Sequence, residues 1–471
     1  MKIAFVYPAI SESGFNINRE PVIFSQIHAG LCSLSAVCKK EGYSDISLID
    51  MRTLAGWEDF ADKVSCLGPD LIGISIMSPD YYIAKQCIDV IKGINPGIKI
   101  VVGGMHPTVM TEEVKANEKV DHIITGEAEI SFPKLIRDLD EGKACQRVIT
   151  GQRPDVNDLP YIDRELFECL ELAYDFFLPL PFVTILAGRG CGYNCKFCSP
   201  AGKLMHGYRI RRRGVENIIG ELKDLKMRYG IRSFQFWDDC FTESRSWVMD
   251  FCDAYRETGL AMPFVCQTRA DIVCKNPDMM AELKKAGLKM ASIGFESGND
   301  RVLKFINKGT TLKQNLEAAR ICGRLGIKVW AYHIYGFPTE TPMEALDTVK
   351  MIKRIKPYRS SAAFFTPQPG SHFYDYCKNE HLSLIDDHDS FVRFPENDKP
   401  KIRNIDYGLM RKYAGISKDV SFSTKIRIRL ERVFWHKVNK PFKAWFKQKR
   451  SESGITNSMC MLRLKKGEGF I

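Results

Sequence analysis

Gly188-Arg189-Gly190-Cys191-Gly192-Tyr193-Asn194-Cys195-Lys196-Phe197-Cys198 is the stretch on which the interpretation of the whole chain depends. Its three cysteines are separated by three and then two residues, so one short loop presents three thiolates to one small inorganic cluster. A cubane [4Fe–4S] cluster has four irons, and three cysteines leave one iron open to another ligand. The glycines let the backbone wrap closely around a large group. The spacing therefore predicts an iron–sulfur site.

Other interpretations of the three cysteines are weaker. A structural zinc site needs four ligands, and the nearest extra candidates, His206 and Cys240, are distant in sequence. A ferredoxin-type site needs a fourth nearby cysteine. The chain has 16 cysteines, but most stand singly among apolar residues, as Cys87 and Cys252 do. Those are expected to be small core residues in a reducing compartment.

The segment after Phe182 alternates between strand and helix patterns. Strands are expected at 182–187, 233–239, 264–271, 289–297, 328–336 and 361–368, with helices at 215–229, 246–258, 276–287, 312–325 and 342–355. Six β/α units in a row predict a partial (β/α)6 barrel of the TIM type, with function at the carboxyl ends of the strands. The cysteine loop directly follows the first of these strands.

An earlier set of apolar runs, at 2–8, 45–51, 70–78, 98–104 and 120–126, also alternates with helical patterns. This alternation predicts a doubly wound, Rossmann-like parallel sheet with helices on both faces. The fold class is therefore α/β. The expected domains are 1–145, a linker at 146–180, the barrel at 181–375 and a C-terminal extension at 376–471.

The cysteine loop and the motifs after it resemble the radical S-adenosylmethionine (SAM) superfamily, in the branch with an N-terminal cobalamin-binding domain. The resemblance covers about residues 1–375. It implies a [4Fe–4S] cluster on Cys191, Cys195 and Cys198, whose open iron binds SAM. Reductive cleavage of SAM then gives a 5′-deoxyadenosyl radical. The resemblance also places Phe197 near the adenine.

The same resemblance assigns further SAM contacts to the strand ends of the barrel. Asp238 and Asp239 would recognise the amino group, and Glu296 and Ser297 the ribose or carboxylate. Gly336, in a turn that also contains Pro338, would lie against the adenine. Arg269 is a plausible partner for a carboxylate. Acidic residues, serines and glycines also cap helices and form turns, so purely structural roles stay open.

Three segments at the strand ends of the first domain resemble cobalamin-binding domains, and their site residues are Ser75, Ser78, Gly103, Gly104, Gly126 and Glu127. The paired glycines allow close backbone approach to a flat, bulky ligand. One departure is the absence of an Asp-x-His-x-x-Gly motif. His28 has Gln26 where the aspartate should be, and the run 386–388 has Phe391 in place of the glycine. A sheet domain whose glycines merely form turns is the alternative.

The positive charge of the chain is concentrated in its C-terminal extension. The chain carries +11, yet residues 401–471 contain 18 Lys and Arg against 5 Asp and Glu, so the first 400 residues carry −2. A nucleic-acid-binding body is therefore not expected. Residues 422–449 predict a basic amphipathic helix, which would dock on the barrel, lie on a membrane surface or bind a macromolecular partner.

No apolar run is long enough for a transmembrane span, and no signal peptide precedes the first strand. A cytoplasmic protein is expected, with a peripheral position at the inner membrane face if the basic helix binds lipid.

The function implied by the resemblance is cobalamin-dependent methylation of an unactivated carbon. The partners would be a small-molecule substrate, for which lipid-like and tetrapyrrole-like compounds are candidates, and an external electron donor of the flavodoxin or ferredoxin type. Other radical chemistry, such as oxidative cyclisation or rearrangement, is the first alternative. A methylthiotransferase would need a second cluster motif that the N-terminal cysteines lack. A non-catalytic cobalamin or SAM sensor would not need an open iron.

Overall fold

The apolar runs of the first 150 residues form a six-stranded parallel sheet with the order β2-β1-β3-β4-β5-β6. The computed structural model describes residues 1–11, 14–18, 26–173, 177–385, 391, 399–418 and 422–452. The strands of this sheet are β1 (Ile3–Tyr7), β2 (Ile46–Asp50), β3 (Leu71–Ser75), β4 (Lys99–Gly103), β5 (His122–Thr125) and β6 (Val148–Thr150). Because β2 and β3 lie on opposite sides of β1, the topological switch point falls between β1 and β3.

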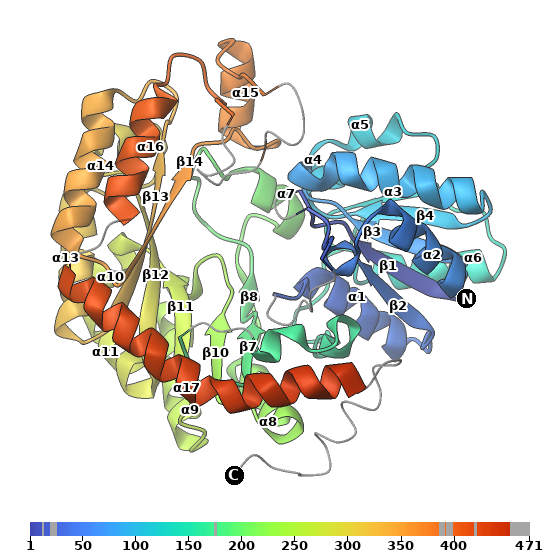
Figure 1. Ribbon diagram of the computed structural model, residues 1–471, viewed down its shortest axis with the longest axis horizontal. Coiled ribbons are helices and arrows are strands. Elements are labelled where there is room, and N and C mark those ends of the chain that lie inside the picture. Colours follow the sequence, from blue (N-terminus) through green and yellow to red (C-terminus); the bar gives the residue numbers. More distant parts are fainter. Residues whose placement is uncertain are drawn as a thin grey trace.

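Helices cover both faces of this first sheet, as a doubly wound fold requires (Figure 1). They are α1 (Ala29–Lys40), α2 (Trp57–Leu67), α3 (Tyr81–Ile94), α4 (Met105–Val109), α5 (Thr111–Lys115) and α6 (Ser131–Asp140). One apolar cluster joins the sheet to α2 and α3 through Phe60 and Ile88. A second cluster joins the other face to α1 and α6 through Leu31 and Phe132. The expected Rossmann-like architecture is confirmed.

The sheet extends past residue 145, where the first domain was expected to end. Strand β6 lies inside the expected linker 146–180 and pairs in parallel with β5, with Ile123 opposite Val148. It has only three residues and lies at the edge of the sheet. A strand this short carries little apolar periodicity, which is why the sequence did not indicate it.

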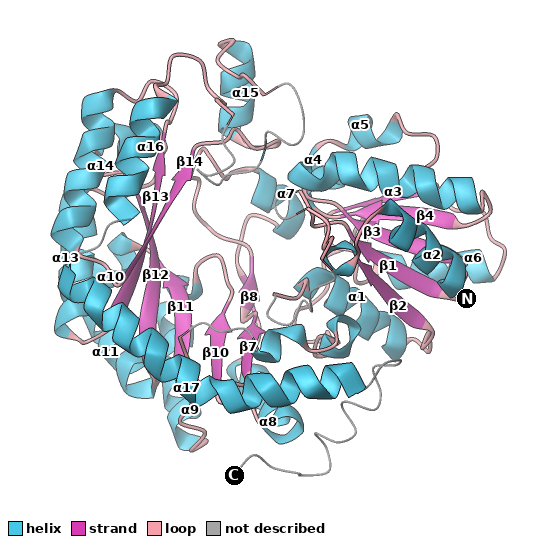
Figure 2. Ribbon diagram, in the orientation of Figure 1, coloured by secondary structure: helices cyan, strands magenta, loops and turns pink. Residues whose placement is uncertain are grey.

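The second sheet is also six-stranded and parallel, with the order β14-β13-β12-β11-β10-β7. Its strands are β7 (Phe182–Ile185), β10 (Ser233–Phe236), β11 (Phe264–Thr268), β12 (Leu288–Glu296), β13 (Lys328–Tyr335) and β14 (Arg359–Phe364). Strands β7 and β14 are its two edges, so the sheet is a curled half-barrel (Figure 2). The predicted partial barrel is confirmed.

The helices of the half-barrel cover its convex face (Figure 2). They are α8 (Val215–Tyr229), α9 (Arg245–Glu257), α10 (Ala270–Lys275), α11 (Pro277–Ala286), α12 (Asp300–Phe305), α13 (Leu312–Arg324), α14 (Pro342–Ile355) and α16 (Tyr407–Lys418). Short elements connect them: the ribbon β8 (Gly188–Arg189) and β9 (Arg211–Arg212), and the helices α7 (Ala201–His206) and α15 (His372–Asn379). Single 3-10 turns are η1 (Met51–Thr53), η2 (Ser78–Asp80), η3 (Arg164–Phe167), η4 (Leu170–Ala173) and η5 (Phe241–Glu243).

The basic segment forms one long helix, α17 (Phe422–Glu452), which continues through Pro441. It crosses the amino-terminal ends of the barrel strands (Figure 1). Asn439 is 1% exposed, accepts a hydrogen bond from Leu180 N and donates one to Leu178 O, both at 3.1 Å. Phe446 is buried in the barrel core. The docked-helix interpretation is therefore correct for this face of α17.

Two sequence features fall outside the described residues: the 386–388 run and the end of the C-terminal extension, 453–471. Within the described ranges, no helix combines the length and apolarity that a membrane-crossing segment needs.

Replacing Asn439 by Ala is expected to lower the free energy of unfolding by about 1–3 kcal/mol, because two buried backbone groups lose their partners. A urea denaturation curve followed by fluorescence measures this as a lower midpoint. Lys440→Ala, one residue along on the exposed side of the helix, is the control. An unchanged midpoint for Asn439→Ala would show that the helix end is not held by this side chain.

Candidate functional site

The carboxyl ends of the two sheets face each other across a cavity of about 400 Å³. This volume lies within the range of cofactor and ligand pockets. The first domain contributes the ends of β3, β4 and β5, and the barrel contributes the ribbon strand β8, helix α7 and the residues after β7 and β10. Residues that were predicted as binding residues and that line the cavity are Ser75, Gly103, Gly104, Gly126, Glu127 and Asp239.

Two glycines shape the floor of the cavity. Gly104 has φ +100°, and a Cβ atom there would lie 3.0 Å from both the N and the O of Ile76. Gly126 has φ +75°. Both positions are in the region that side chains rarely adopt, and at Gly104 the lack of a Cβ lets the chain pass close to the backbone of Ile76.

An apolar slot forms the deeper wall of the cavity, between the sheet and helices α1 and α6. Its residues, all 3% exposed or less, are Phe5, Leu31, Val101, Ile124 and Phe132. Gly73 lies beneath it, where a Cβ atom would lie 2.9 Å from the ring of Phe5. The slot therefore suits a flat apolar group rather than a charged one.

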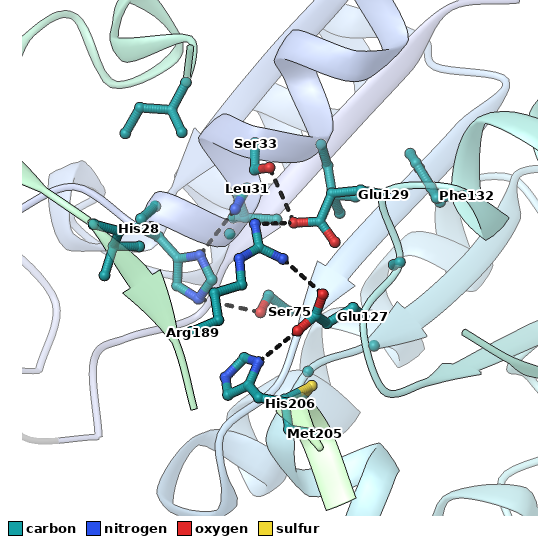
Figure 3. Close-up of a pocket in the computed structure, with 18 of the residues that line it drawn as sticks. His28, Leu31, Ser33, Ser75, Glu127, Glu129, Phe132, Arg189, Met205 and His206 are labelled. Atoms are coloured by element: carbon teal, nitrogen blue, oxygen red, sulfur yellow. Dashed lines mark hydrogen bonds and ion pairs between the residues drawn. The ribbon is translucent and has the colours of Figure 1, made fainter. Parts of the chain in front are cut away.

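His28 lines the cavity with both ring nitrogens already in use (Figure 3). Its Nδ1 accepts a hydrogen bond from Leu31 N at the start of α1, which places the proton on Nε2. Nε2 then donates to Ser75 Oγ at 3.2 Å. Burial lowers the pKa of His28 to about 4, so the ring stays neutral. Ser78 lies elsewhere: it is buried, with its Oγ 3.2 Å from His106 Nδ1.

Glu127 is the centre of the contacts between the two domains (Figure 3). This buried carboxylate of the first domain accepts hydrogen bonds from Arg189 at 3.0 Å, from His206 Nδ1 at 2.8 Å and from Arg211. Burial alone would raise the pKa of Glu127, but the hydrogen bond from His206 and the charges of Arg189 and Arg211 outweigh burial, and the net pKa lies below its usual value. The carboxylate is therefore ionised and ties the barrel to the first domain.

Arg189 connects this centre to the cysteine loop. One of its nitrogens donates to Glu127 and another to Glu129, which also accepts from Ser33 at 3.0 Å. Cys191 follows two residues later. A shift of the first domain would therefore move the backbone next to the first cysteine.

The cysteine loop is anchored at several points along its backbone. Glu243 accepts from Gly192 N at 3.2 Å, and Ile306 O accepts from Lys196 N at 2.9 Å. Cys195 is buried, Cys191 is half-buried and Cys198 is exposed. In the described part of the chain, no group of three or more His, Cys, Asp or Glu side chains converges on a single metal ion. Three thiols on one short loop are the donor set that a cubane takes through three of its irons.

Two cations flank the buried thiol of Cys195. Arg269 Nη1 lies 3.7 Å from Cys195 Sγ, and the guanidinium stacks on the ring of Tyr193 at 3.5 Å. Arg269 also binds Asp271 at 3.0 Å. Burial alone would lower the pKa of Lys308, but Glu296 and Cys195 raise it above its usual value. Positive groups here favour the negative charge of a reduced cluster.

The two predicted aspartates have different surroundings. Asp238 is 2% exposed, pairs with Arg212 at 3.0 Å and accepts from Ala187 N at 3.0 Å. Burial raises its pKa to about 6, although Arg212 opposes this. Asp239 lines the cavity. Its pKa lies above the usual value, because desolvation raises it more than His206 lowers it. Only Asp239 can therefore meet a ligand in the cavity.

The predicted segment Glu296–Ser297 is held by contacts within the protein. Glu296 has φ +62° and accepts from Lys308 Nζ at 2.9 Å. Ser297 is fully buried, and its Oγ lies 3.3 Å from Thr348 Oγ1. Asn299 caps α12.

The turn after β13 contains Gly336, with φ +79°, and ends at a buried carboxyl group. Glu340 Oε2 accepts from Gly336 N at 2.6 Å and from Phe337 N at 3.3 Å. Burial raises the pKa of Glu340 to about 8, so its carboxyl group is mostly protonated at neutral pH. The ring of Phe197 lies 5.9 Å from that of Phe337, which places the end of the cysteine loop beside this turn.

Several residues of the site had no role predicted from the sequence: Glu129, Arg189, Arg211, Lys308 and Glu340. His206 was considered only as a zinc ligand. Arg189 stands within the cysteine stretch and could have been included on that ground. Nothing in the sequence connects Glu127 with His206, since 79 positions separate them.

Comparisons with known proteins assign a family to each of the two domains. Residues 24–136 match the B12 binding domain, and residues 185–352 match the Radical SAM superfamily. The chain has a B12-binding domain and a radical SAM domain. It is 28% identical, over 75% of its length and 79% of the relative's, to an uncharacterized methyltransferase of Pyrococcus horikoshii. It is also 28% identical, over 79% and 69%, to the anaerobic magnesium-protoporphyrin IX monomethyl ester cyclase of Rubrivivax gelatinosus.

A solved structure shares the arrangement of both domains. The cobalamin-dependent SAM radical enzyme OxsB, with aqua-cobalamin and SAM bound, superposes with a TM-score of 0.66. The two share 18% sequence identity, and the alignment covers 99% of this chain and 70% of OxsB. At this identity the comparison supports the fold of the B12-binding and radical SAM domains.

Glu340 is expected to make stability fall as pH rises. Its folded pKa of about 8 lies above the ordinary value of 4.5, so its contribution is complete below about pH 4.5 and is lost as pH rises through 8. Glu340→Gln keeps an acceptor for both backbone donors and should remove this loss, on the order of a few kcal/mol. Thermal unfolding of both proteins between pH 5 and 9 measures the difference.

Glu344→Gln is the control for this titration. Arg301 lowers the pKa of Glu344 to about 2, so the ionised carboxylate adds a constant amount to stability above about pH 5. Its substitution should lower stability evenly between pH 5 and 9 and leave the slope of the wild-type pH profile unchanged. If the thermal unfolding midpoints of Glu340→Gln and the wild type changed in parallel with pH above pH 5, the raised pKa of Glu340 would be contradicted.

Proposed function

We propose that this chain is a cobalamin-dependent radical SAM enzyme that transfers a methyl group to an unactivated carbon of a small-molecule substrate. The observation that carries the proposal is the position of the cysteine loop, tied through Arg189 to the wall of the B12-domain cavity. When bound, the [4Fe–4S] cluster and SAM supply a 5′-deoxyadenosyl radical, and cobalamin supplies the methyl group. Hydrogen abstraction and methyl delivery then occur on one substrate in one cavity.

Cys191, Cys195 and Cys198 would hold the cluster through three irons. Arg269 and Lys308 then offset the charge of the Cys195 thiolate. These cations are buried, so their effect is less screened than that of surface charges.

A bound SAM would contact the residues that still face the opening. Asp239 is the acidic residue available for its amino group, and Phe197 with the Gly336 turn would flank the adenine. Asp238 and Ser297 are positioning residues in this scheme, since their polar atoms are bonded within the protein.

The apolar slot and the glycine floor fit cobalamin by their chemistry. A flat aromatic part of the cofactor would enter between Leu31 and Phe132, and its polar edge would meet Ser75 and the backbone at Gly103, Gly104 and Gly126. His28 has no free lone pair for cobalt, because its nitrogens bind Leu31 N and Ser75 Oγ. His28 is therefore not available as a ligand to the metal of a bound cobalamin.

A second candidate function is oxidative cyclisation or another rearrangement, with cobalamin in another role or lost. It is favoured by the similarity to the Rubrivivax cyclase. Methyl transfer consumes one SAM as methyl donor and one as radical source, so it yields both S-adenosylhomocysteine and 5′-deoxyadenosine. Cyclisation yields 5′-deoxyadenosine alone, and a sensor yields neither.

The partners in this proposal are a small-molecule substrate, with lipid-like and tetrapyrrole-like compounds as candidates, and an external electron donor. A flavodoxin or ferredoxin would deliver the electron that reduces the cluster.

Anaerobic reconstitution with iron, sulfide, reductant and SAM tests the cluster. The wild type should form 5′-deoxyadenosine, and Cys198→Ala should reduce its formation to below about 1% because the cluster loses a ligand. Cys66→Ala removes another exposed cysteine and is the control, with activity unchanged. Cleavage of SAM by Cys198→Ala at the wild-type rate would refute the cluster assignment.

Equilibrium dialysis with hydroxocobalamin tests the B12 cavity. Ala128→Trp places a large ring into the cavity and should weaken cobalamin binding by about a hundredfold. Ala444→Trp, on the exposed side of α17, should bind as the wild type does. Equal binding by both variants, or none by the wild type, would contradict the cobalamin part of the proposal.

A further inference from the structure

An apolar strip lies exposed on the outer face of α17. Its members and their exposed fractions are Ile426 (44%), Leu430 (65%), Val433 (49%) and Phe434 (56%). The spacings of four, seven and eight residues from Ile426 put all four on one side of the helix. A contiguous run of large apolar side chains on the surface marks an interaction site more often than scattered single ones do.

A row of basic side chains accompanies the strip. Arg429, Lys437, Lys440 and Lys447 are exposed, and none makes an ion pair with a described residue. The acidic residue within this part of the helix, Glu431, turns inward to Lys328 Nζ at 2.6 Å and to Tyr358 OH at 2.5 Å. The outer face is therefore apolar and positive, with its nearest negative charge neutralised.

Among the described residues nothing covers the strip, because the face of α17 that meets the rest of the protein is the opposite one. Asn439 holds the backbone before β7, Phe446 lies in the barrel core, and Phe442 packs with Leu178 and Met290. The face is preformed and needs no folding step before it binds a partner.

We infer that this outer face of α17 binds the surface of a membrane that contains anionic lipid. The apolar strip would enter the boundary between headgroups and acyl chains, and the basic row would meet lipid phosphates. Lysine is depleted in protein interfaces but enriched on helices that lie on membranes, which favours lipid over a protein partner. A second copy docked through the same strip would bring two basic rows together.

The position of α17 separates this contact from catalysis. The helix crosses the amino-terminal ends of the strands, whereas the cavity lies at their carboxyl ends. Membrane contact through α17 would tether the enzyme with its cavity facing away from the membrane. The contact therefore does not indicate that the substrate is a lipid. The inference does not rest on the proposed function.

Co-sedimentation of the full-length chain with lipid vesicles tests the inference. The wild type should bind vesicles of equal phosphatidylcholine and phosphatidylglycerol and should bind pure phosphatidylcholine at least about tenfold more weakly. The double variant Leu430→Glu/Phe434→Glu should lose binding by about tenfold or more. Lys437→Gln/Lys440→Gln should weaken only the binding to anionic vesicles.

The matched control is Met227→Glu/Met343→Glu, which adds the same two charges at exposed apolar side chains of α8 and α14. This control should bind vesicles as the wild type does. Thermal unfolding midpoints of all variants show whether each one is folded. The inference would be overturned if the control lost as much vesicle binding as Leu430→Glu/Phe434→Glu does, or if the wild type did not bind vesicles. A wild-type dimer that Leu430→Glu/Phe434→Glu converts to monomer, without lipid binding, would assign the strip to a second copy instead.

Discussion

The ionised carboxylate of Glu127 is the interaction on which the arrangement of this protein depends. It is 4% exposed, and a buried charge of this kind is stable only with partners. All three of its partners come from the barrel half of the chain: Arg189, His206 and Arg211. The cost of burying the charge therefore fixes how the two domains sit. Because Arg189 leads directly into the cysteine loop, the same contact sets where the three thiols face.

The two parallel sheets present their carboxyl ends to each other, and this explains why functional residues concentrate at one place. Loops after parallel strands all emerge at one edge, so two such edges enclose a cavity between them. Polar residues at and near these strand ends divide into those whose polar atoms face the cavity and those whose polar atoms are bonded within the protein. Asp239 belongs to the first group, while Asp238, His28 and Ser297 belong to the second.

Helix α17 has two faces with different physical roles. Its inner face completes the half-barrel at the end opposite the cavity, through the side-chain amide of Asn439 and the ring of Phe446. Its outer face keeps apolar and basic side chains in solvent. The sequence alone left docking and membrane contact as competing interpretations, but on one amphipathic helix they concern opposite sides and are compatible.

The sequence by itself determined the local features: the two α/β units, nearly every strand within a few residues, and the cysteine loop after the first barrel strand. These follow from apolar periodicity and from spacing along a short loop, both of which are local. The tertiary structure alone decided that β6 joins the first sheet and that Asp239 rather than Asp238 faces the cavity. It also decided the Glu127 contacts, which join residues 62 to 84 positions apart. Such pairs leave no periodic signal, because the chain brings them together only when the two sheets pack.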